Sequence, residues 1–219
     1  MARTPVNGST LSIAATFGAT KTMSAITNAA SAVATLEASH GVGVNDIVQI
    51  LTSGWSKLID RVAKASAVNV NDVTLSGLDT LNTSDYPTGS GAGTVREVST
   101  WTQVAQIHTD TLSPSGGEPT KQSFQYLDQR QATEEFVGEE PASIQFEIDD
   151  DPTLAGQILL ETLTASRESR PFLFTAPNGY KLYGAGTFFI SSAPILRPNL
   201  SWRRICTVSY KGRTTQYTS

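Results

Sequence analysis

Apolar and polar side chains alternate along much of this chain, and the alternation predicts β-strands. It is clearest in the segment SIQFEI, where Ile144, Phe146 and Ile148 share one face and Gln145 and Glu147 share the other. Such a strand buries its apolar face in a core and turns its polar face to water. Further strands are expected at residues 9–15, 95–107 and 121–127.

Two aromatic runs flank a turn in residues 172–188, FLFTAPNGYKLYGAGTF. The Pro-Asn-Gly sequence between them predicts a β-hairpin. A last strand is expected at residues 202–211, with Cys206, Val208 and Tyr210 on one face. The sheet is therefore expected to have one polar face along several strands.

The chain from residue 26 to residue 94 has a different sequence pattern. Short Val-rich runs are broken by closely spaced turn signals, which predicts a small β-barrel or sandwich of four to five strands. The segment YPTGSGAG, residues 86–93, is typical of a flexible connection. We therefore expect a small β domain at residues 26–94, inserted into a discontinuous β-sandwich domain of residues 1–25 and 95–219.

One helix is expected to begin at Asp151 and Pro152. An aspartate can cap free backbone amides, and proline fits the first turn because its missing N–H has no partner there. Arg167 and Arg170 fall at the expected carboxyl end, where the helix dipole favours positive charge, and Pro171 is expected to end the helix. Four residues form its expected apolar stripe: Leu154, Ile158, Leu159 and Leu163.

Residues 128–141 follow neither a two-residue nor a 3.6-residue period, which predicts a long loop. This loop belongs to an acidic region, because residues 131–151 hold eight acids and no Lys or Arg. Residues 152–219 hold eight bases against Glu161 and Glu168. The asymmetry is either an accident of solvated faces or a device that favours head-to-tail stacking of copies.

Composition narrows the functional classes. Charged residues make up 16% of the chain, below the roughly 25% of ordinary soluble domains, which suits extensive contact with other subunits. The net charge of -4 and the lack of a basic patch argue against a nucleic-acid binder. Cys206, the single cysteine, is expected to be a small buried hydrophobe. No apolar run or charged leader predicts a membrane span or a signal peptide.

Clustered acids are the first candidate for chemistry. Asp149, Asp150 and Asp151 offer hard oxygen ligands for Mg²⁺ or Ca²⁺. Acids before a helix are also favoured by its positive end, and no Gly-spaced ligand loop accompanies them. We therefore expect no metal and no other cofactor.

Catalysis has little support in this sequence. His40 and His108 are the only histidines, and no nucleophile-elbow motif accompanies either. The glutamates of residues 128–141 lie in a segment expected to be mobile, which does not favour an acid–base pair. We expect no enzyme.

Four segments resemble, as an ordered set, the major tail tube proteins of long-tailed, siphophage-type bacteriophages. They are GGEPTKQSFQYLD, SIQFEIDDDPTLAGQILLE, RPFLFTAPNGYKLYGAGTF and TVSYKGRTTQYTS. The resemblance implies a β-sandwich flanked by one helix, with six copies closing into a ring. Four strands of each copy would line a barrel of about 24 strands, wide enough to pass DNA. The block at residues 26–94 departs from a minimal tube protein.

The resemblance also implies the partners. Rings of this protein would stack in the virion tail, meet tail-tip and tail-terminator proteins, and be made in the host cytoplasm. DNA would slide through without specific binding, so the lining should be polar or negative, and Gln145 and Glu147 are expected to face the lumen. The amino-terminal segment at residues 1–8 and the loop at residues 128–141 are expected to bridge subunits. Six residues of the loop carry that expectation: Arg130, Glu134, Glu135, Phe136, Glu139 and Glu140.

The alternative function comes from another class, a carbohydrate-binding or adhesion β module of a virion or cell surface. Such a module should show an exposed aromatic cluster on a concave face, whereas a tube subunit should expose apolar side chains at its edges. The three tryptophans are too dispersed along the chain to decide.

Overall fold

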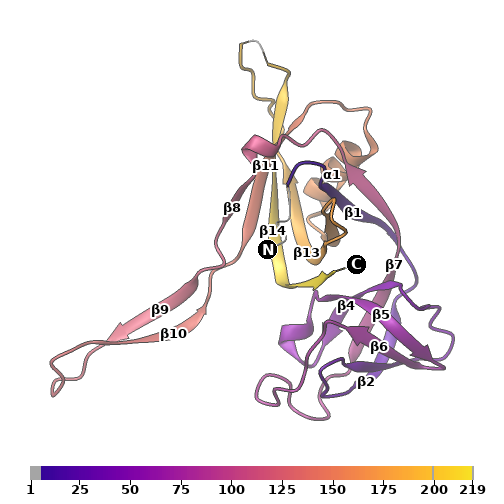
Figure 1. Ribbon diagram of the computed structural model, residues 1–219, viewed down its shortest axis with the longest axis vertical. Coiled ribbons are helices and arrows are strands. Elements are labelled where there is room, and N and C mark those ends of the chain that lie inside the picture. Colours follow the sequence, from indigo (N-terminus) through magenta and orange to yellow (C-terminus); the bar gives the residue numbers. More distant parts are fainter. Residues whose placement is uncertain (1–5, 199, 219) are drawn as a thin grey trace.

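The computed structural model describes residues 6–198 and 200–218 (Figure 1). Within these residues the fold is mainly β with one α-helix, as the alternation predicts. Twelve strands belong to one continuous antiparallel sheet, and two further strands form a separate hairpin. The lumen barrel expected from several copies is an assembly property and stays a prediction.

Six strands close into a small barrel. They are β2 (Lys21–Ile26), β3 (Val33–Leu36), β4 (Ile47–Ser53), β5 (Val62–Asn69), β6 (Asp72–Ser76) and β7 (Gly93–Val104). They pair in the order β2-β3-β6-β5-β4-β7, and β2 pairs with β7 to close the set. Four of the six lie entirely within residues 26–94, and the predicted division of the chain into domains at these residues stays a prediction.

The barrel core is centred on Trp55, which is 2% exposed. Its ring meets Tyr86 edge to face at a centroid distance of 5.3 Å. The indole Nε1 donates to the Pro87 carbonyl at 2.7 Å and to the Ser90 hydroxyl at 3.0 Å. Residues 86–93, expected to be a flexible connection, are instead packed on the tryptophan through Pro87, Ser90 and Gly91.

The sheet continues from β7 through six more strands. In sheet order they are β1 (Thr10–Phe17), β12 (Ser169–Thr175), β13 (Lys181–Ile190), β14 (Arg203–Tyr217), β11 (Ser143–Asp149) and β8 (Ser113–Ser115). The predicted hairpin is confirmed as β12 and β13, joined by a turn in which Gly179 has a φ of +83°. The predicted first and last strands correspond to β1 and β14.

One face of this sheet carries the second core. Leu11, Ile13, Phe146, Phe172 and Phe188 are buried there. Cys206 and Val208 of β14 lie among them and are fully buried, so the expectation for the thiol is confirmed. Burial raises the pKa of the Cys206 thiol to about 12.

Helix α1 (Ala155–Ser166) covers this core, and its boundaries differ from the prediction. Asp151 caps the turn before the helix, accepting from the Thr153 amide at 3.0 Å. Arg167, with φ of 55°, ends the helix, so Arg170 and Pro171 belong to β12. The apolar stripe is also shifted: Leu160 and Leu163 are buried, whereas Ile158 is 51% exposed.

The barrel and the rest of the sheet meet through a third buried apolar cluster, which includes Ile47, Val98 and Tyr183, and through polar and aromatic contacts. The Arg96 guanidinium lies 3.5 Å from the centre of the Phe17 ring, and that of Arg170 lies 4.8 Å from it. The Tyr217 hydroxyl donates to the Ser76 carbonyl at 2.6 Å and accepts from the Lys64 amide at 2.8 Å. These contacts join strands that are far apart in sequence.

Two short 3-10 helices complete the described elements, η1 (Ser56–Leu58) and η2 (Thr109–Thr111). Residues 1–5 of the amino-terminal segment predicted to bridge subunits lie outside the described residues. Next to them, the Ser9 amide donates to the Val6 carbonyl at 3.0 Å. Over residues 6–198 and 200–218, no helix has the length and apolar character needed to cross a membrane.

Replacing Trp55 by Ala is expected to destabilise the protein by about 3–5 kcal/mol, because it removes a buried aromatic side chain and leaves a cavity. Equilibrium unfolding in urea measures the change. Trp202→Ala is the matched control, since Trp202 is 62% exposed and its loss should stay within about 0.5 kcal/mol. Equal losses in the two variants would contradict the assignment of Trp55 to the core.

Cys206 is expected to resist thiol reagents at pH 8 in the folded protein. Its pKa of about 12 leaves little thiolate, and the sulfur is out of reach of solvent. In guanidinium chloride the thiol should react completely, because its pKa returns to about 8.5. A colorimetric thiol assay distinguishes the two, and fast reaction of the native protein would show that the core opens.

Candidate assembly surfaces

The most exposed part of the molecule is a hairpin, here called the arm, that stands away from the body (Figure 1). It consists of β9 (Pro119–Phe124) and β10 (Thr133–Glu139). The expected loop at residues 128–141 is therefore wrong, because half of it is the strand β10. Both faces of the arm meet solvent, so no buried face imposes alternation, and a bulge between Phe136 and Gly138 disturbs the period further.

The base of the arm is set by two glycines. Gly116 and Gly117 have φ of +74° and +78°, a conformation that other residues rarely adopt, and a Cβ on Gly116 would lie 2.1 Å from the Pro141 carbonyl oxygen. They turn the chain from β8 into β9. The two strands close where the Glu140 amide donates to the Glu118 carbonyl at 2.8 Å.

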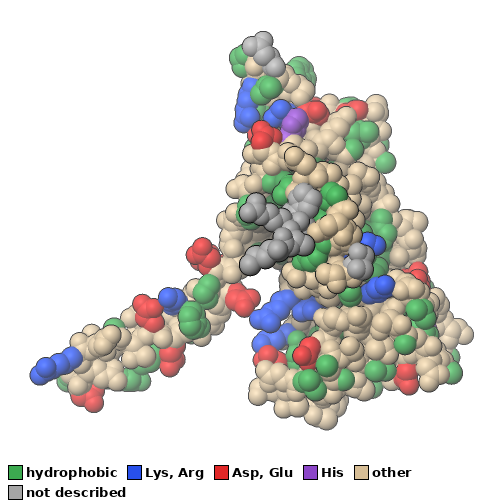
Figure 2. Space-filling model, in the orientation of Figure 1, with side chains coloured by type: hydrophobic (Ala, Val, Ile, Leu, Met, Phe, Trp, Pro, Cys, Tyr) green, Lys and Arg blue, Asp and Glu red, His purple; other side chains and the backbone are tan. Residues whose placement is uncertain are grey.

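The arm carries large apolar side chains with little cover. Tyr126 is 61% exposed, Phe136 is 72% exposed and Val137 is 60% exposed, and Leu127 is fully exposed. Figure 2 shows such side chains along the arm among charged ones. The Lys121 ammonium lies 5.5 Å from the Phe136 ring centre and 3.3 Å from a Glu134 carboxylate oxygen, which orders one face.

The structure gathers the six predicted loop residues on the arm. Arg130 lies in the turn at its tip, and Glu140 follows β10 at its base. Glu134, Glu135, Phe136 and Glu139 lie within β10, and all six are exposed. Glu139 reaches back to the body, where it accepts from the Arg213 guanidinium at 3.2 Å.

An open cleft of about 1540 Å³ separates the arm base from the body. Its apolar lining includes Ile59 beyond η1 and Tyr210 on β14, which lie across from Phe136 and Val137 of the arm. A cleft of this size, lined by apolar and charged side chains, suits a segment of another chain.

The predicted lumen residues lie on the face of the sheet opposite α1. Gln145 is exposed, and its strand neighbour in the register is Thr207. Glu147 is nearly buried, because two arginines cover it: Arg197 donates to it at 3.0 Å and Arg203 at 3.2 Å. These contacts largely neutralise the carboxylate. That these residues face a lumen stays a prediction.

The Glu147 contacts hold down a second projection, the β13–β14 loop at residues 191–202. The loop rises beyond the end of the sheet (Figure 1) and exposes Leu196 and Trp202, which are 64% and 62% accessible. Sequence reasoning missed the arginine pair, because Glu147 lies about fifty positions before Arg197 and no local motif links them.

His108 and Asp149 also come together near this loop. The His108 Nε2 atom lies 2.9 Å from an Asp149 carboxylate oxygen, and the Ser201 hydroxyl donates to the same oxygen. These hydrogen bonds, that of Ser201 above all, lower the pKa of Asp149. The aspartate stands between the other two side chains, so the histidine has no serine to activate, and the arrangement is not that of a nucleophilic triad.

The aspartates before α1 are engaged in local structure. Asp150 accepts from the Gln157 amide group at 2.8 Å, and Asp151 accepts from Thr153. In the described part of the chain, no group of three or more His, Cys, Asp or Glu side chains is placed to hold a metal ion.

A comparison with protein families identifies the family of this chain. Residues 53–219, more than half of the chain, match the phage tail tube protein family. The chain belongs to this family. A search of curated proteins finds no match.

Membership in the phage tail tube family gives the protein a structural role in the tail tube and places it in the virion tail. The match begins at Ser53, within β4, and includes the arm, the β13–β14 loop and the whole of β11. The projecting elements therefore lie within the matched residues.

Glu147→Gln is expected to loosen the β13–β14 loop, because two charge-assisted contacts of about 1.5 kcal/mol or more are lost. Amide hydrogen exchange at residues 195–197 and 200–203 should accelerate about tenfold, as expected for a change of about 1.4 kcal/mol. Glu134→Gln is the control, since its Lys121 partner is exposed and distant from the loop. Unchanged exchange in Glu147→Gln would show that the arginines do not anchor the loop.

Proposed function

We propose that this tail tube protein assembles by itself into hexameric rings, and that the rings stack into the conduit through which DNA is ejected into the host. The family supplies the structural role. The observation that carries the assembly mechanism is the arm, whose second strand is exposed at every residue.

Exposure of the whole arm to water is energetically unfavourable. A two-stranded hairpin is marginally stable in water by itself, because it has no core. This hairpin also exposes Tyr126, Phe136 and Val137, whose transfer from water is favourable by roughly 25 cal/mol for each Å² buried. A neighbouring copy that covers these side chains would stabilise the arm and gain binding free energy from the same contact.

We assign the inter-subunit contacts to the six predicted residues of the arm and to the amino-terminal segment at residues 1–8. The apolar part of the contact is centred on Phe136. The charged part comes from the residues around it: Arg130, Glu134, Glu135, Glu139 and Glu140. Mixed apolar and charged surfaces of this kind give both affinity and a defined orientation.

The lumen is assigned to the face of β12, β13, β14 and β11 opposite α1. Its exposed positions include Gln145 and Ser209, which are polar and uncharged. Arg197 and Arg203 both form ion pairs with Glu147, so these two cations are opposed by a carboxylate and are not free to hold a DNA phosphate. DNA would slide past such a surface without binding.

Ring closure would use the edges of the sheet. β8 covers β11 only at Ser143–Gln145 and contains Pro114, which cannot donate a ladder hydrogen bond. Four strands from each of six copies would give a barrel of about 24 strands, wider than the 16–18 strands that already enclose a channel.

The mechanism involves no turnover and no cofactor. Tail-tip and tail-terminator proteins would be the partners at the two ends of the tube, after synthesis in the host cytoplasm. The adhesion alternative needs aromatic side chains gathered on a concave face. Tyr126, Phe136 and Trp202 instead lie on the arm and the β13–β14 loop, which project from the body.

Removing the arm is expected to abolish assembly and leave a folded subunit. Residues 119–139 can be replaced by Asn-Gly, because Glu118 and Glu140 already face each other across the hairpin base. Urea unfolding should match the intact protein, since the arm contributes nothing to either core. Negative-stain electron microscopy across a concentration series should show six-fold rings or tubes for the intact protein only.

Val70→Ser is the matched control, because Val70 is 83% exposed at a barrel turn away from the arm. It should assemble as the intact protein does. Tubes from the protein without the arm would refute the role of the arm, and a uniform monomer of the intact protein that binds glycans would favour the adhesion module.

A further inference from the structure

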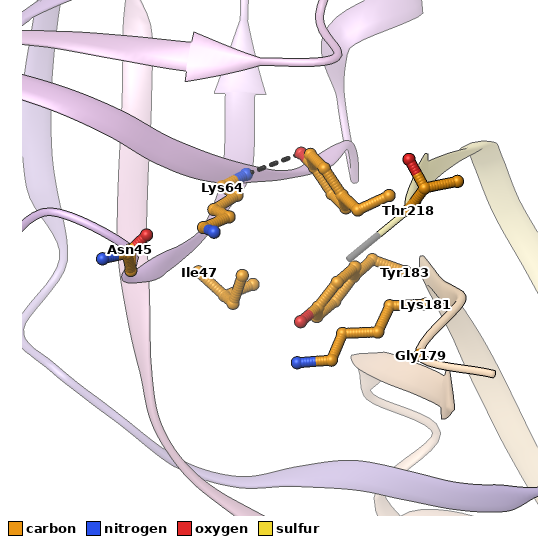
Figure 3. A pocket seen from close by; sticks show the side chains of 8 residues that line it. Asn45, Ile47, Lys64, Gly179, Lys181, Tyr183 and Thr218 are labelled. Atoms are coloured by element: carbon orange, nitrogen blue, oxygen red, sulfur yellow. Dashed lines mark hydrogen bonds between the residues drawn. The ribbon is translucent and has the colours of Figure 1, made fainter. Parts of the chain in front are cut away.

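A second recess lies between the barrel and the rest of the sheet, and it is lined by two lysines (Figure 3). Its volume is about 320 Å³. The barrel contributes Asn45, Ile47 and Lys64, and the other wall is formed by Lys181 and Tyr183 with Gly179, Tyr217 and Thr218. No acidic side chain belongs to this described lining, which is here called the lysine pocket.

Both lysine ammonium groups lack a partner among residues 6–198 and 200–218. Lys21, Lys57 and Lys121 all form ion pairs with carboxylates, whereas Lys64 and Lys181 form none within the described chain. Figure 3 shows the two side chains directed into the same space. Two like charges that line one recess repel each other, and a bound anion would reduce that repulsion.

The walls of the pocket suit an anion in other respects. Ile47 and Tyr183 are 8% and 6% exposed, so the floor is apolar and weakens screening by water. Burial raises the pKa of the Tyr183 hydroxyl, which therefore stays protonated and able to donate. The bonds of Tyr217 to Ser76 and Lys64 fix one wall to the other, so little ordering is needed on binding.

The arm is the acidic part of the chain that is available to fill this pocket. Residues 118–140 hold six acids against Lys121 and Arg130. Within β10, Glu134 is paired with Lys121 and Glu139 with Arg213, while Glu135 has no ion pair in the described structure. Glu135 also points away from the Lys121 face, because neighbouring strand residues face opposite sides.

We propose that the lysine pocket binds the Glu135 carboxylate of a second copy of this chain, with Lys64 and Lys181 as its charged partners. The contact would place the arm of one copy against the junction between barrel and sheet of the next. Charge-assisted hydrogen bonds to two ammonium groups would then set the orientation of the arm. This inference rests on the proposed self-assembly.

Charge exchange tests the pair directly. Lys181→Glu and Glu135→Lys are each expected to raise the protein concentration needed for rings or tubes at least tenfold, because each places like charges together. The protein with both substitutions should assemble within about threefold of the original concentration. Sedimentation and negative-stain microscopy measure assembly, and urea unfolding confirms that each variant is folded.

Glu118→Lys is the matched control, since it makes the same charge change at the arm base and should leave assembly unchanged. Normal assembly of Lys181→Glu, or two impaired single variants that are not restored by combination, would overturn the pairing and leave the proposed function intact. Failure of the unsubstituted protein to form rings or tubes would count against both.

Inorganic phosphate distinguishes a free anion from the arm. Calorimetric titration of the unassembled subunit should show phosphate binding that Lys181→Glu removes, and phosphate should inhibit assembly if the carboxylate uses the same pocket. Phosphate binding together with normal assembly of Glu135→Lys would assign the pocket to a free anion and overturn the proposal.

Discussion

The structure depends on one strand that serves two parts of the sheet. The first half of β7 pairs with β4 and β2 in the barrel, and its second half pairs with β1. The barrel is thereby held to the larger sheet by a continuous ladder of hydrogen bonds as well as by side chains. Gly93, where β7 begins, permits this close pairing, because a Cβ there would lie 1.9 Å from the Thr52 carbonyl oxygen. Every projecting element is positioned on this frame.

The two cores and the projections have different roles: the cores stabilise the subunit, and the projections expose apolar side chains to other copies. The buried residues around Trp55 and Phe172 stabilise the subunit. The junction between them holds a third buried cluster, against which Phe17 packs between two guanidinium groups. Large apolar side chains left in water gather on the arm and on the β13–β14 loop. The apolar side chains of the cores are already buried, whereas those of the projections are exposed. Burying the exposed ones against another copy would be favourable, which agrees with a place in the phage tail tube.

Sequence patterns predict best the segments that have one buried face. The segment at 143–148 and the hairpin around Gly179 were predictable, because a core on one side of a strand forces every second residue to be apolar. The sequence of the arm predicts a loop, because both faces of the arm meet solvent and nothing selects between polar and apolar positions. The predicted helix starts earlier than α1 does, because Asp151 caps a turn as readily as a helix and local sequence does not distinguish the two.

The sequence by itself determined the strand-rich class, the tight turns, the burial of Cys206 and the family resemblance, since these depend on local patterns. Only the tertiary structure decided which distant groups meet. It closed β2 onto β7, covered Glu147 with Arg197 and Arg203, and directed Lys64 and Lys181 into one pocket. The physical reason is that strand order and register place side chains together across more than a hundred positions, and no short-range period in the chain carries that information.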